Sequence, residues 1–190
     1  AVQLGDEDDY FQSGLFTIAR RRILWLLILV LANGLTTKVI AMNDQILKEI
    51  VLLAAFIPLL IGTGGNVGAQ SSTVVIRGLS TQKLKSLGAF KAVVKEAITG
   101  ALLGILMMLV VFPFAWWQGE GPLIASAVGI SLISITTLAA TAGAILPLLF
   151  DRMGLDPALM SSPFITTVTD IAGVFIYLST ANWLLNSSIL

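Results

Sequence analysis

The chain has 190 residues, of which 56% are apolar and 12% charged, and its mean hydropathy is +0.93. Soluble domains carry about 25% charged residues, so this composition excludes an ordinary water-soluble domain and predicts an all-α integral membrane protein. The 11 basic and 11 acidic residues cancel, which removes the electrostatic basis for a nucleic-acid partner.

Cysteine and histidine are both absent from the sequence. The sequence therefore lacks the side chains that usually form disulfides, zinc sites, haem ligands and Ser-His or Cys-His catalytic pairs. We do not expect an enzyme. Any metal must be held by oxygen ligands, which favours hard cations such as Mg²⁺, Ca²⁺ or the alkali ions.

Five apolar runs predict one membrane domain over residues 23–190, because each has about the 20 residues that span a bilayer as a helix. Residues 1–22 precede them as an amphipathic juxtamembrane segment, which contains an acidic run at 6–9 and ends on three arginines. The predicted spans are 23–40, 50–79, 93–116, 123–150 and 163–185.

The second span contains a run of small and polar residues, Gly62-Thr63-Gly64-Gly65-Asn66-Val67-Gly68-Ala69-Gln70. Each glycine costs a helix about 1 kcal/mol relative to alanine, so this run, after Pro58, predicts a break or loosening of the helix. Irregular backbone at membrane depth is tolerated only against protein or a water-filled cavity. Gly64, Gly65 and Asn66 are therefore candidate pore-lining residues, and a glycine-rich packing surface is the alternative.

The fifth span carries a carboxylate, Asp170, seven residues after Pro163 and so about 10 Å deep. Asp at the centre of a membrane helix costs about 2.5 to 3.5 kcal/mol, which something must offset. Its helical face is mostly small or polar, and Thr166, Thr167 and Gly173 are the candidate pore-lining residues on it. Asp170 is the candidate metal ligand. A structural hydrogen bond to the second span, without an ion, is the alternative.

The basic residues predict the orientation of the chain. If the spans alternate, nine of the 11 fall on one side, which the positive-inside rule assigns to the cytoplasm. The N-terminus is then cytoplasmic and the C-terminus lies outside. The nine are Arg20, Arg21, Arg22, Arg77, Lys83, Lys85, Lys91, Lys95 and Arg152, and Lys38 and Lys48 fall on the other side.

Residues 58–79 resemble the second membrane helix of MgtE-type magnesium channels. Asp156-Pro157-Ala158, Ser161-Ser162-Pro163 and Thr169-Asp170 resemble the start of that family's fifth helix. The resemblance implies a homodimer of five-helix protomers in a bacterial inner or plasma membrane, with a pore on the two-fold axis and the ion-binding carboxylate at Asp170. It also implies cytoplasmic N-terminal and CBS-type regulatory domains in the full-length protein, beyond the sequence given, with residues 1–22 as the connecting helix.

Mg²⁺ loses its water reluctantly and is usually bound through one or two carboxylates plus water. Two copies of Asp170 balance the charge of one divalent ion. The sequence therefore predicts a channel that conducts hydrated Mg²⁺ inward through a dimeric pore, driven by the membrane potential. A secondary exchanger that uses Asp170 is one alternative, and a non-transporting membrane scaffold is the other.

Overall fold

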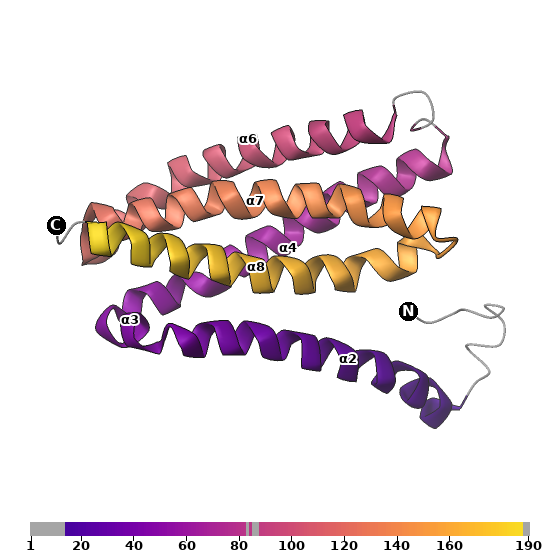
Figure 1. Ribbon diagram of the computed structural model, residues 1–190, viewed down its shortest axis with the longest axis horizontal. Coiled ribbons are helices and arrows are strands. Elements are labelled where there is room, and N and C mark those ends of the chain that lie inside the picture. The colour runs from indigo at the N-terminus through magenta and orange to yellow at the C-terminus, as the bar shows by residue number, and fades with distance from the viewer. Residues whose placement is uncertain (1–13, 83, 85–87, 188–190) are drawn as a thin grey trace.

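The computed structural model describes residues 14–82, 84 and 88–187, and this part of the chain is helical, with no strand. Its long helices lie side by side (Figure 1). They are α2 (Leu15–Met42), the short α3 (Asp44–Glu49), α4 (Val51–Ser80), α6 (Ala89–Ala115), the π-helix η1 (Trp116–Glu120), α7 (Gly121–Arg152) and α8 (Pro157–Ser187). The acidic run at 6–9 lies outside the described residues, and from Leu15 the predicted juxtamembrane segment continues into α2 without interruption.

Four described helices are long and apolar enough to cross a bilayer. They match the second to fifth predicted spans, and the described part of α2 adds a shorter apolar stretch, Leu26–Met42. The prediction of an all-helical chain with long apolar helices is therefore confirmed for the described residues, while the first of the five spans stays a prediction. The four helices are Val51–Ser80, Ala89–Gln118, Gly121–Arg152 and Pro163–Asn186.

The glycine-rich run does not break its helix, so that prediction is wrong. α4 is continuous from Val51 to Ser80. A Cβ added at Gly64 would lie 2.8 Å from Cγ2 of Ile135 in α7, and one added at Gly68 would lie 2.5 Å from Cγ2 of Ile165 in α8. The missing side chains let neighbouring helices approach α4, and this contact offsets the poor helix propensity of glycine. At these two positions the run is a packing surface.

α7 is the central helix of the bundle. In Figure 1 it lies between α6 and α8, with α4 crossing them. Of its most apolar window 61% is buried, against 17% for α6, so α7 forms the core and α6 keeps a wide apolar face for lipid. Gly100 of α6 makes close contact possible, because a Cβ there would lie 2.5 Å from the carbonyl oxygen of Thr136 in α7.

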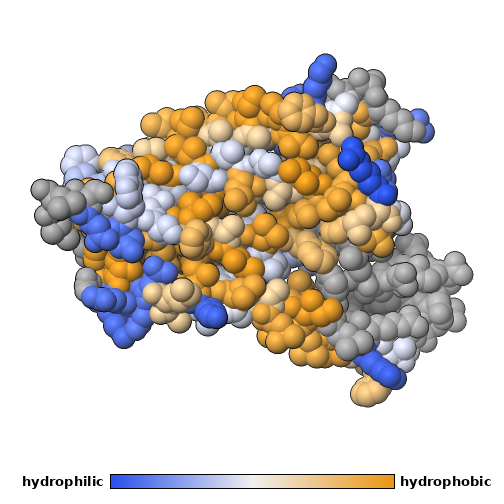
Figure 2. Space-filling model, in the orientation of Figure 1, coloured by the Kyte–Doolittle hydropathy of each residue, from blue (hydrophilic) through white to orange (hydrophobic). Residues whose placement is uncertain are grey.

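The polar residues gather toward the two ends of the bundle. Figure 2 shows apolar side chains over most of one face, with most hydrophilic side chains near its ends. The start of α2, the connection from α4 to α6 and the connection from α7 to α8 lie at one end, and α3 and η1 lie at the other (Figure 1). The first end carries the helix termini with Arg20, Arg77, Lys91, Lys95 and Arg152; we call it the basic end.

Candidate functional site

Asp170 lies on α8, the last helix in the described part of the chain. α8 begins at Pro157, and the Ala158 N–H donates a hydrogen bond of 2.9 Å to Oδ1 of Asp156, which caps the helix. Asp170 follows more than three turns later and is partly buried. Among the described residues, its carboxylate has no hydrogen bond or ion pair with protein, so the structural bond to the second span is not observed.

Three threonines precede the carboxylate on α8. Thr166 and Thr167 donate their hydroxyl protons to the Pro163 carbonyl at 3.0 and 2.9 Å, and Thr169 donates to the Thr166 carbonyl at 2.9 Å. A hydroxyl that donates backward along its helix can still accept hydrogen bonds through its oxygen. The O–H groups of water around a cation are donors, so this turn of α8 has the polarity that a hydrated cation needs.

The glycine run of α4 lies against this turn of α8. A Cβ added at Gly65 would be 3.8 Å from Cγ2 of Thr166, and one added at Gly64 would be 3.7 Å from Cβ of Thr169. The structure therefore brings together two segments that the sequence marks separately and that lie about a hundred residues apart. The backbone of α4 can approach the carboxylate-bearing helix because no side chain intervenes.

The predicted site residues do not all reach the same surface. Gly64 is buried, and Gly173 is buried with its Cβ position 3.6 Å from Ile135 of α7. Within this chain both are packing positions, and their pore-lining role stays a prediction. The accessible residues are Gly65, Asn66, Thr166, Thr167 and Asp170, all exposed or partly exposed.

Sequence reasoning missed a polar strip that extends this surface along α4 toward the basic end. Asn66, Gln70, Thr73 and Arg77 are exposed at intervals of three or four residues, which places them on one face of the helix. A cavity of about 370 Å³, lined by Ser72, Thr73, Arg77 and Ala158 among others, lies between this strip and the start of α8. The interval of four from Asn66 to Gln70 could have signalled the strip.

Within the described residues, no group of three or more acidic side chains is arranged to hold a metal ion. Asp170 is the single acidic residue of α8, and α4 has none. α4 and α8 together therefore offer a single carboxylate, with hydroxyl, amide and backbone oxygens around it. This donor set suits a hydrated hard cation and is too small to replace the water shell of Mg²⁺.

Comparison with known proteins identifies the family to which this chain is related. The model of the MgtE family, described as divalent cation transporters, matches residues 57–180, which include the glycine run and Asp170. The chain is 38% identical to the magnesium transporter MgtE of Thermus thermophilus over 178 residues, or 94% of this chain and 39% of that protein. It is 35% identical to the magnesium transporter MgtE of Enterococcus faecalis, over 86% of this chain and 36% of that protein.

A third relative, the magnesium transporter MgtE of Bacillus subtilis, is 31% identical over 95% of this chain and 40% of its own length. The chain thus spans about two fifths of the length of these relatives. The family match covers well over half of the chain, and it falls on the helices that carry the site. The chain belongs to the MgtE family of divalent cation transporters.

Proposed function

We propose that residues 23–190 form the pore domain of a magnesium channel, in which Asp170 holds the permeating ion. The observation that carries this proposal is the Asp170 carboxylate, partly buried at membrane depth and without a protein partner among the described residues. It lies within the family-matched region, beside the glycine run of α4. Residues 1–22 connect this domain to the regulatory domains of a longer protein.

Charge balance supports a dimer around the carboxylate. Holding one Asp at the centre of a membrane helix costs about 2.5 to 3.5 kcal/mol, and a second copy adds repulsion. One divalent cation between two copies of Asp170 neutralises both charges. Mg²⁺ then keeps its inner water, and the carboxylates and the Thr166 hydroxyls accept hydrogen bonds from that water.

The membrane potential supplies the driving force. Moving one charge through 100 mV is worth about 2.3 kcal/mol, so a divalent ion gains about 4.6 kcal/mol. The gathering of helix termini with basic residues at one end supports a cytoplasmic N-terminus and a C-terminus outside, in a bacterial plasma membrane. Inward conduction then needs no coupled ion.

The test is Mg²⁺ uptake into proteoliposomes under an imposed membrane potential, with Asp170→Ala and Asp170→Asn beside the original chain. We expect both substitutions to lower uptake at least tenfold, the effect of losing about 1.4 kcal/mol of ion stabilisation. Asp156→Asn is the matched control, because it removes one carboxylate at the basic end and keeps a good helix cap. Undiminished uptake by a folded Asp170→Ala variant would reject the proposal.

The same vesicles separate a channel from an exchanger. A channel conducts Mg²⁺ with identical Na⁺ concentration and pH on both sides, and its flux follows the applied potential. An exchanger that uses Asp170 requires a gradient of the second ion. Loss of uptake when those gradients are removed would favour the exchanger, while a scaffold would show no Mg²⁺ flux under any condition.

A further inference from the structure

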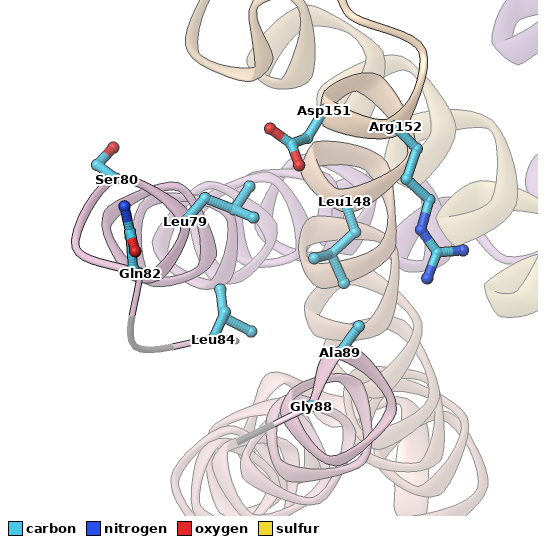
Figure 3. A pocket seen from close by; sticks show the side chains of 9 residues that line it. All are labelled: Leu79, Ser80, Gln82, Leu84, Gly88, Ala89, Leu148, Asp151 and Arg152. Carbon is cyan, nitrogen blue, oxygen red and sulfur yellow. The ribbon is translucent and has the colours of Figure 1, made fainter. Parts of the chain in front are cut away.

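A second cavity, remote from Asp170, lies at the basic end of the bundle. It has a volume of about 580 Å³, is open on one side, and is lined by residues at the end of α4, the start of α6 and the end of α7 (Figure 3). This volume is within the range of roughly 300 to 1,000 Å³ that is usual for small-molecule sites. The lining residues used below are Leu79, Leu84, Leu148, Asp151 and Arg152.

The apolar wall of this cavity is fixed by contacts to α4. Leu84 packs on Gly78 of α4, where an added Cβ would lie 2.5 Å from Cδ1 of Leu84. The turn before it is held by the Thr81 hydroxyl, which donates to the Arg77 carbonyl at 2.8 Å, and by the Gln82 N–H, which donates to the Leu79 carbonyl at 3.1 Å. These contacts position Leu84 against the end of α4.

Two side chains of opposite charge line the cavity. Asp151 and Arg152 are exposed, and neither has a side-chain hydrogen bond or ion pair among the described residues. Consecutive helical residues point about 100° apart, so the two cannot readily pair with each other. In Figure 3 they leave α7 on different sides. Both residues line the cavity, so a ligand with two charges that fills it can meet the carboxylate on one side of α7 and the guanidinium on the other.

The position of the cavity narrows the choice of ligand. It lies where four helices of bilayer length end, at the depth of the lipid headgroups. Leu79, Leu84 and Leu148 provide an apolar wall on which the first segments of an acyl chain can pack. A phospholipid headgroup meets both conditions, because it carries its charges at the interface and its chains beneath them.

We propose that this cavity binds the headgroup of a zwitterionic phospholipid with a primary ammonium, of the phosphatidylethanolamine class. Arg152 binds the phosphate through paired N–H donors, and Asp151 accepts hydrogen bonds from the ammonium. A purely anionic headgroup is repelled by Asp151. A choline headgroup has no N–H to donate, so its quaternary ammonium gains less from the carboxylate.

The experiment is lipid binding to the purified full chain in detergent, followed by native mass spectrometry. Phosphatidylethanolamine, phosphatidylglycerol and phosphatidylcholine with identical acyl chains are titrated separately. We expect phosphatidylethanolamine to bind at least several-fold tighter than the other two. Arg152→Gln should weaken all three by about tenfold, as expected for the loss of a charge-assisted hydrogen bond. Asp151→Asn should remove the preference over phosphatidylcholine.

Two control variants carry matched charge changes at the same end, outside the cavity: Asp156→Asn and Lys91→Gln. Neither should alter the lipid preference. Leu148→Trp fills the cavity without a charge change and should weaken all three lipids, which tests the location independently of charge. Equal affinity for the three lipids, or a control effect as large as that of Asp151→Asn, would overturn the proposal. Mg²⁺ uptake is not the readout, so the result is independent of the proposed transport function.

Discussion

Gly143 lies at a point of close approach between α7 and α4. A Cβ added there would collide with the backbone carbonyl oxygen of Gly68 and would lie 3.0 Å from Cβ of Ser71. A backbone oxygen cannot rotate away as a flexible side chain can, so Gly143→Ala must push the two helices apart. Gly62, also on α4, provides the matched control, because nothing lies within 4 Å of its Cβ position.

Both substitutions replace a helical glycine by alanine, but only Gly143→Ala creates a steric clash. Replacing a helical glycine by alanine gains up to about 1 kcal/mol of helix propensity at either position. Overpacking a tight contact costs about 1 to 3 kcal/mol. We therefore expect Gly62→Ala to be neutral or slightly stabilising, and Gly143→Ala to be about 1 to 3 kcal/mol less stable than Gly62→Ala.

The free energy of unfolding can be measured by titrating the protein in mixed micelles with a denaturing detergent and following helicity by circular dichroism. Both variants and the original chain are compared under identical conditions. If Gly143→Ala unfolds at the same detergent fraction as Gly62→Ala, the close α4–α7 packing described above is refuted. The explanation for the continuous α4 helix would then fail with it.

The same unfolding assay tests three further predictions. Tyr177→Phe should cost about 0.5 to 1.5 kcal/mol, because it removes the buried hydrogen bond of 3.1 Å to the Leu53 carbonyl that joins α8 to α4; an unchanged stability would contradict this. Asp156→Ala should cost about 1 kcal/mol by removing the cap on the Ala158 N–H, whereas Asp156→Asn should restore most of it. Gln82→Gly should stabilise by up to about 1 kcal/mol, since Gln82 has φ of 56°, and a loss of stability would argue against this turn.

Asp170 could be singled out from the sequence as a candidate, because a charged side chain inside an apolar helix is costly and so indicates a function. Asp170 stands out in an apolar run, and the family match includes it. The neighbouring polar strip was less visible, because Gln70 and Thr73 become a surface only once the exposed face of α4 is known. The cavity beside Asp151 and Arg152 could not be predicted, since it forms between three helix ends that are distant in sequence.

The sequence by itself predicted a membrane environment and located the four candidate spans found in the described residues, because the transfer of apolar side chains into a bilayer depends on local composition. The resemblance noted in the sequence named the family that the comparisons confirm. Only the tertiary structure decided whether the glycine run is helical. Propensity predicts a break at Gly64 and Gly68, yet Ile135 and Ile165 pack against these positions. The stability of a glycine-rich helix depends on what approaches it, and that information lies elsewhere in the chain.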